Sequence, residues 1–153
     1  MFKIVSHSEI ETFNVAKKLA NFFNKGDIIV LSGNLGAGKT KFVEGFLDFF
    51  SMSSEISSPT FTIVNEYVNQ SINIYHFDVY RLTDEDEFLA IGGMDYFDNG
   101  ICLIEWGEKI HPLLPHEYIK INFEKDINQE NIRYLEIIPY GKKYEDLLKE
   151  VII

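Results

Sequence analysis

Residues 33–40 read Gly33-Asn34-Leu35-Gly36-Ala37-Gly38-Lys39-Thr40. A glycine, four further residues and then Gly-Lys-Thr form the signature of a phosphate-binding P-loop. Residues 27–32, which precede it, are rich in β-branched apolar side chains, and residues 41–50 carry apolar side chains at helical spacing. The loop is therefore predicted to join a strand to a helix, the context in which this signature binds phosphate.

The residue types of this loop suit an anion. Gly33, Gly36 and Gly38 allow the backbone to curl until its N–H groups point at one centre, and the following helix adds the positive end of its dipole. Lys39 supplies a positive charge for the β- and γ-phosphates, and the Thr40 hydroxyl suits Mg²⁺. All eight residues of the loop are therefore predicted to hold the phosphates of a nucleotide.

Length and composition predict one folded domain over residues 1–153. The chain is 46% hydrophobic and 25% charged, which is typical of globular proteins. No apolar run approaches the roughly 18 residues that a membrane span needs. Residues 1–6 turn polar too soon for a signal peptide, so a cytoplasmic protein without membrane contact is expected.

The net charge is −10, from 24 acidic and 14 basic residues, and Arg81 and Arg133 are the two arginines. Such a chain repels nucleic-acid backbones and suits docking to a basic protein partner. An arginine finger accelerates phosphoryl transfer by about 10³–10⁵. The shortage of arginine therefore predicts slow hydrolysis by the chain alone, with Arg81 as the candidate internal finger.

A candidate Walker B strand lies further along the chain. Residues 101–104 are apolar and are followed by Glu105, which is the pattern of a buried parallel strand that delivers a carboxylate beside the P-loop. Trp106 comes next and is predicted to pack either over the nucleotide or at the edge of the core.

A second carboxylate belongs to the alternating run 75–82. Asp78 lies on its polar side, where it is placed to hold Mg²⁺ or to orient a water. A surface pair with Arg81, or a cap for the following helix, is the structural alternative. His76 lies on the same side and fits a core histidine better than a base.

Two other stretches hold candidate nucleotide contacts. A helix that opens with a capping box at residues 8–11 precedes the P-loop strand, so Glu9 and Thr12 are candidates for contact with the base or ribose. A solvated helix face is the alternative for these two residues. Ser58 and Thr60 follow the P-loop helix, where many P-loop switch proteins carry a γ-phosphate sensor.

The overall pattern predicts an α/β fold, a single P-loop NTPase domain with a mixed, mainly parallel sheet flanked by helices. Residues 61–68 and 72–77 are predicted to form an antiparallel hairpin after the P-loop helix. Residues 117–124 and 131–138 alternate like strands, and the second suits an antiparallel edge. Residues 142–151 are predicted to form a closing helix.

Four motifs now stand in order along the chain: residues 33–40; Ser58-Pro59-Thr60-Phe61; residues 75–82; and residues 101–106. Together they resemble the TsaE (YjeE) family, the P-loop ATPase of bacterial tRNA threonylcarbamoyladenosine (t6A) synthesis, over nearly the whole chain. The resemblance implies a domain that binds ATP or ADP with Mg²⁺ and hydrolyses ATP slowly alone. It also implies work with the TsaB–TsaD pair, which modifies A37 of tRNAs that read ANN codons, so that tRNA is met through the complex.

The resemblance also implies roles for individual residues. Thr40 and Glu105 would serve Mg²⁺, and Asp78 would lie near the metal or the attacking water. Glu9 and Thr12 would contact the adenine side, and the Ser-Pro-Thr stretch would act as a switch. Many relatives have proline after the tryptophan, where this chain has glycine. Residues 126–133, which lie near the base in relatives, have no pattern that aligns with the family.

Lys39, Asp78 and Glu105 are thus the predicted catalytic residues of an ATPase. Two alternatives remain from the sequence: a small-molecule kinase of the P-loop class, and a nucleotide-binding module without turnover. A kinase needs an acceptor site, a lid and several cations, for which this chain is poorly equipped. The binding module fits if Asp78 and Glu105 are merely structural.

Overall fold

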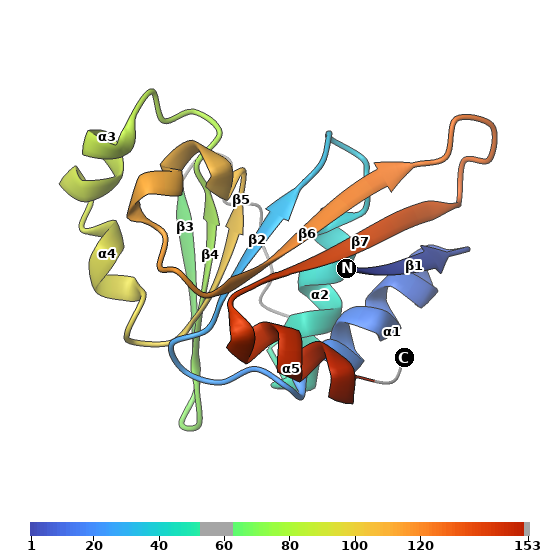
Figure 1. Cartoon of the computed structure of the whole chain (residues 1–153), viewed down its shortest axis with the longest axis horizontal. Coiled ribbons are helices and arrows are strands. Elements are labelled where there is room, and N and C mark those ends of the chain that lie inside the picture. Colours follow the sequence, from blue (N-terminus) through green and yellow to red (C-terminus); the bar gives the residue numbers. More distant parts are fainter. Residues whose placement is uncertain (53–62, 152–153) are drawn as a thin grey trace.

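The computed structural model describes residues 1–52 and 63–151. Along the chain, its elements are β1 (Phe2–Ser6), α1 (Glu9–Ala20), β2 (Ile28–Ser32), α2 (Lys39–Phe49), β3 (Val64–Val68), β4 (Asn73–Asp78), α3 (Glu85–Ala90), α4 (Gly93–Tyr96), β5 (Ile101–Glu105), the 3₁₀ segment η2 (Gly107–Leu113), β6 (Tyr118–Lys125), β7 (Arg133–Tyr140) and α5 (Lys142–Glu150). The P-loop lies between β2 and α2 (Figure 1), as the sequence predicts. Within the described residues, every helix is too short or too polar to cross a lipid bilayer.

Seven strands form one mixed sheet in the order β1-β7-β6-β2-β5-β4-β3. The middle strands β6, β2, β5 and β4 are parallel to one another, whereas β7 runs antiparallel to β6 and β3 runs antiparallel to β4. The mixed α/β sheet and the β3–β4 hairpin confirm the predicted fold. β2 therefore carries the P-loop at the centre of the sheet, with β5 on one side and β6 on the other.

The prediction that the last strand forms a sheet edge is wrong. β7 pairs with β6 on one side and with β1 on the other, from Phe2↔Ile137 to Ser6↔Arg133. Alternation of side chains reports which residues face the core, and it carries no information about a further strand on the open side. β1 therefore forms this edge and brings Ser6 beside the start of β7.

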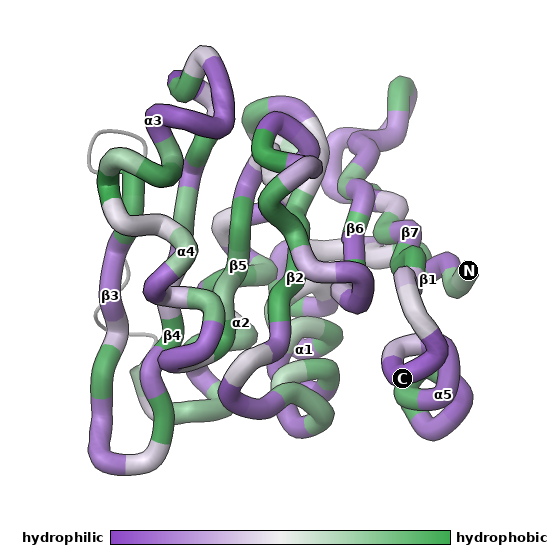
Figure 2. The backbone as a smooth tube through the Cα atoms, turned by 60° about the vertical axis from the view of Figure 1, so that its left-hand side comes forward, coloured by the Kyte–Doolittle hydropathy of each residue, from purple (hydrophilic) through white to green (hydrophobic). Residues whose placement is uncertain are grey.

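Two hydrophobic layers cover the sheet. Ile29 and Leu31 of β2 pack toward α1, α2 and α5, whereas Ile28 and Val30 pack toward the layer formed with α3, α4 and η2. All five residues of β2 are buried, as expected for a central strand. Figure 1 shows α3 and α4 apart from α1, α2 and α5, and Figure 2 shows the hydrophobic run of β2 and β5 between them.

Helices α1 and α2 pack closely and side by side. The Cα of Gly45 lies so near α1 that a Cβ there would be 2.0 Å from the Phe13 carbonyl oxygen. One turn further along, Lys17 and Asp48 form an ion pair of 2.8 Å. These contacts set the two helices parallel, so that the start of α1 lies beside the start of α2. The first turn of α1 is thereby brought next to the P-loop.

The start of β2 is tied to the last helix by a buried carboxylate. Asp27 is 2% exposed, and its Oδ1 accepts hydrogen bonds from the Tyr144 hydroxyl and from Lys143 Nζ at 2.7 Å. Its Oδ2 accepts the Asn24 amide. Burial, together with the bond to Asp27, raises the pKa of the Tyr144 hydroxyl. A buried carboxylate needs such partners, so this cluster fixes α5 against the central strand.

Candidate functional site

A cavity of about 720 Å³ opens at the carboxyl ends of the central strands. Eleven of the predicted site residues line it: Glu9, Thr12, Asn34, Leu35, Gly36, Gly38, Lys39, Thr40, Asp78, Glu105 and Trp106. Gly33 and Ala37 belong to the loop but are not among the lining residues, and Ser58 and Thr60 lie outside the described residues. The fold therefore gathers most of the predicted site around one hollow, from segments that are far apart in the sequence.

The P-loop backbone has the conformation that its glycines allow. Gly36 and Gly38 have φ angles of 84° and 109°, in the left-handed region that other residues rarely adopt. At Gly33 a Cβ would lie 2.6 Å from the carbonyl oxygen of Phe123, so a larger residue would push β6 away. The side chain of Leu35 is fully exposed and that of Ala37 is buried in the core, so both serve the loop through their backbone.

The start of α2 is shaped to receive an anion. Gly38 is its N-cap and offers no side-chain hydrogen bond to the first amides of the helix. Those amides and the positive end of the helix dipole therefore face the cavity, which is the arrangement that binds phosphate in other proteins. The residues present thus fit a nucleotide phosphate.

Lys39 is 7% exposed, and its charge is compensated by groups around the cavity. Its Nζ donates a hydrogen bond to the Gly33 carbonyl and lies 3.5 Å from Glu105 Oε1. The same atom lies 4.8 Å from the centre of the Trp106 ring, a cation–π contact. A phosphate in the loop would compete with these partners for the lysine.

The two predicted carboxylates lie side by side at the ends of β4 and β5. Asp78 and Glu105 are direct partners in the parallel register. Burial raises the pKa of the Glu105 carboxyl, but the hydrogen bond and charge of His76, with the charge of Lys39, outweigh it and leave the pKa below its usual value. Glu105 is therefore held as an anion. Asp78 is half-buried, and its Oδ1 accepts the Tyr80 amide at 3.0 Å, so it also caps the turn after β4.

Trp106 forms a wall of the cavity at this end. Its backbone is left-handed, with a φ angle of 62°, and its ring lies beside the Lys39 ammonium. The centre of the Trp106 ring lies 5.2 Å from the centre of the Tyr80 ring. Lys109 Nζ lies over the other aromatic ring, that of Tyr80, and donates a hydrogen bond to the Tyr80 backbone carbonyl. Trp106 is half-buried, and it both borders the cavity and packs against the core beneath it.

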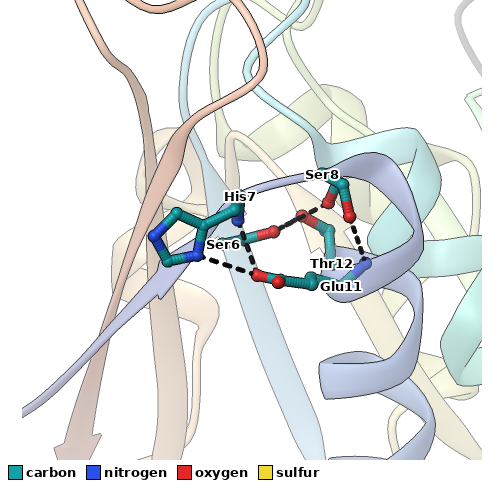
Figure 3. A network of polar contacts seen from close by, with 5 residues as sticks. All are labelled: Ser6, His7, Ser8, Glu11 and Thr12. Atoms are coloured by element: carbon teal, nitrogen blue, oxygen red, sulfur yellow. Dashed lines mark hydrogen bonds and ion pairs between the residues drawn. The ribbon is translucent and has the colours of Figure 1, made fainter.

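The start of α1 also lines the cavity, through Glu9 and Thr12, and Figure 3 shows the polar contacts around this turn. Ser8 caps the helix by accepting the Glu11 amide, as predicted, and Glu11 accepts the His7 amide. Ser6 Oγ donates to the Ser8 carbonyl at 2.8 Å and lies 2.7 Å from Thr12 Oγ1. Because the single Ser6 proton is committed to that carbonyl, Thr12 must be the donor to Ser6. The Thr12 hydroxyl therefore has only acceptor capacity left.

Residues from the loop before β7 and from the first position of β7 also line the cavity, and the sequence did not assign them. Glu130, Asn131 and Arg133 line the cavity, with Arg133 passing close to Gly38. The arginine at the cavity is thus Arg133, and the expected candidate finger, Arg81, is not among the lining residues. Pairing of β1 with β7 places Arg133 opposite Ser6, and this long-range contact left no local signal in the sequence.

A divalent cation fits one side of the cavity. Within the described residues, no three or more histidine, cysteine or acidic side chains gather as a metal cluster. Mg²⁺ bound to a nucleotide needs fewer protein ligands, because it keeps several waters and takes oxygens from the phosphates. The exposed Thr40 hydroxyl and the carboxylates of Asp78 and Glu105 are oxygen donors of the kind it prefers.

Comparisons with known proteins agree on one family. The family model described as threonylcarbamoyl adenosine biosynthesis protein TsaE matches residues 6–133. The tRNA threonylcarbamoyladenosine biosynthesis protein TsaE of Bacillus subtilis is 39% identical over 142 residues, covering 92% of this chain and 87% of the relative. The TsaE protein of Haemophilus influenzae is 37% identical over 140 residues, covering 88% and 89%. The crystal structure of Bacillus subtilis YdiB matches with a TM-score of 0.75 and 34% identity, covering 98% of this chain and 93% of that one.

Proposed function

This chain belongs to the TsaE family, and from that premise we propose that it is the ATP-hydrolysing subunit of tRNA threonylcarbamoyladenosine biosynthesis. Its role lies in t6A modification, as the names of its relatives indicate. The observation that carries the proposal of hydrolysis is the placement of two strand-end carboxylates beside a P-loop in one cavity. Phosphate binding alone would require the loop but neither carboxylate.

Each part of the cavity has a task in this proposal. The loop amides and Lys39 bind the β- and γ-phosphates of ATP, and Thr40 with Glu105 holds the cation. Mg²⁺, when bound, supplies positive charge that offsets the charge on the phosphates. Asp78, next to Glu105, orients the attacking water or a water on the cation. Glu9 and Thr12, which line the same cavity, contact the base.

The same cavity supports slow turnover by the chain alone. Its cationic lining residues are Lys39, Lys41 and Arg133 within the described part of the chain. Lys41 is paired with Glu44 at 2.9 Å, and Arg133 Nη1 donates hydrogen bonds to the backbone carbonyls of Glu130 and Ile132. Within the described residues, the one arginine that lines the cavity is therefore already engaged and does not serve as an arginine finger, which is worth about 10³–10⁵ in rate.

We propose that TsaB and TsaD, the partners that the family resemblance implies, complete the site. The net charge of −10 favours contact with a basic protein surface over contact with tRNA, so tRNA is met through the complex. The proposal also places the protein in the cytoplasm, where this machinery works.

Calorimetry with ATP tests the nucleotide assignment. Lys39→Ala removes the main counter-charge for the phosphates, and we expect it to abolish detectable binding, whereas Lys149→Ala, an exposed lysine on α5, is a matched control that leaves binding unchanged. Unchanged ATP affinity in Lys39→Ala would overturn the P-loop assignment. Hydrolysis is followed as free phosphate, and a phosphorylated small molecule in its place would favour the kinase alternative.

A further inference from the structure

Within the described residues, two buried side-chain polar atoms have no hydrogen-bond partner, His76 Nδ1 and Arg133 Nε. Both belong to residues that line the cavity. Buried polar groups are normally paired, because an unpaired one costs free energy. Of the two residues, His76 contacts Glu105 directly, and the proposed mechanism does not use it.

We propose that His76 is a positioning residue that holds Glu105 in place when a nucleotide phosphate draws Lys39 away. This inference rests on the proposed function, because it concerns the carboxylate assigned to the cation. His76 Nε2 lies 2.7 Å from Glu105 Oε2, and the His76 side chain is 4% exposed. The other carboxylate oxygen, Oε1, faces Lys39 at 3.5 Å.

The direction of the hydrogen bond follows from the acceptor. An ionised carboxylate only accepts, so the proton between the two residues belongs to His76 Nε2. The ring is held on β4, where its neighbour in the register is Leu103 of β5, and the backbone cannot move it without breaking the sheet. His76 is therefore a rigid donor, whereas the long side chain of Lys39 is a movable one.

Nucleotide binding makes this difference matter. A phosphate in the loop takes the Lys39 ammonium, and Glu105, whose side chain is 14% exposed, loses one of its two partners. A largely buried carboxylate without a partner would turn away or take up a proton. The His76 donor fixes Oε2 throughout, so Oε1 is the oxygen that Lys39 releases and that becomes available to the cation or to its bound water.

Three variants separate this role from packing. His76→Gln keeps an amide donor near the position of Nε2, whereas His76→Asn places its donor near Nδ1 and leaves Glu105 without one. Tyr75→Phe, on the same strand but facing the opposite layer, is the matched control. ATP turnover gives one readout. Fluorescence of Trp106, the single tryptophan and a direct neighbour of Glu105, gives the second during Mg²⁺ titration of the ADP complex.

We expect His76→Asn to lower kcat and the apparent Mg²⁺ affinity by about 10- to 100-fold, which is the usual effect of removing a hydrogen-bond partner from a metal ligand. The ADP affinity in the absence of Mg²⁺ is expected to stay unchanged. His76→Gln is expected to restore most of both. Equal losses in the Gln and Asn variants, or wild-type behaviour of His76→Asn, would overturn the positioning role. If the wild type binds MgADP but releases no phosphate, the proposed function fails, and the fluorescence titration still decides whether His76 positions Glu105.

Discussion

The Thr12 hydroxyl provides a test of which base the cavity accepts, because its neighbours determine its hydrogen-bonding polarity. Thr12 donates to Ser6 Oγ, and Ser6 donates to the Ser8 carbonyl, so that Thr12 Oγ1 offers only lone pairs to a ligand. Adenine presents an amino donor at C6, whereas hypoxanthine presents a carbonyl acceptor there. We therefore expect ADP to bind more tightly than IDP, which differs from it at this edge of the base.

The magnitude follows from what the wrong base would leave unpaired. An unpaired buried acceptor costs about 1–3 kcal/mol, which corresponds to a preference of roughly 5- to 150-fold for ADP. Ser6→Ala removes the acceptor that holds the Thr12 proton. The hydroxyl is then free to rotate and donate to the carbonyl of IDP, so the preference is expected to fall toward unity.

Calorimetric Kd values for ADP and IDP measure this preference directly. Ser8→Ala is the control, because it removes the side-chain cap of α1, worth about 1 kcal/mol, but keeps the backbone carbonyl that accepts from Ser6. It is expected to retain the wild-type preference. Equal binding of ADP and IDP by the wild type, or an undiminished preference in Ser6→Ala, would refute the assigned polarity of Thr12.

Three further predictions concern the carboxylates and the packing. Asp78→Asn and Glu105→Gln are each expected to lower the rate of phosphate release, and at least one of them is expected to bind ATP with wild-type affinity in calorimetry. Full t6A formation by both variants in the reconstituted reaction would contradict the metal-site assignment. Gly45→Ala forces a Cβ against the backbone of α1 and is expected to lower the free energy of unfolding in urea by about 1–3 kcal/mol. Tyr144→Phe removes a hydrogen-bond donor from buried Asp27 and is expected to lower the free energy of unfolding by about 1.5–3 kcal/mol. An unchanged urea midpoint in Gly45→Ala would contradict the close contact of α1 with α2, and one in Tyr144→Phe would contradict the role of the bond to Asp27.

The phosphate-binding half of the site could be predicted from the sequence because its signals are local. Glycine spacing before Lys39 reports the backbone conformation, and an apolar run that ends in Glu105 reports a buried strand. The adjacent placement of Asp78 and Glu105 could not be predicted in the same way, because no local pattern indicates that their two strands are neighbours. The parallel pairing of β4 with β5 supplies this placement, since Asp78 and Glu105 are direct partners in its register.

The other half depends on contacts between distant segments. The pairing of β1 with β7 brings Arg133 to the cavity, and no pattern near residue 133 announces it. The sequence favours a core histidine at His76, because an alternating strand reveals burial but does not reveal a hydrogen bond to Glu105 of the neighbouring strand. The acceptor polarity of Thr12 likewise needs the position of Ser6, which only the packed structure supplies.

The most direct test of the proposed function is ATP hydrolysis by the purified chain, measured as phosphate release alone and with TsaB and TsaD present. We expect slow release alone, a clear increase with both partners, and loss of that increase in Lys39→Ala. Phosphate release that is the same with and without the partners would contradict a partner-completed ATPase and would favour a nucleotide-binding module.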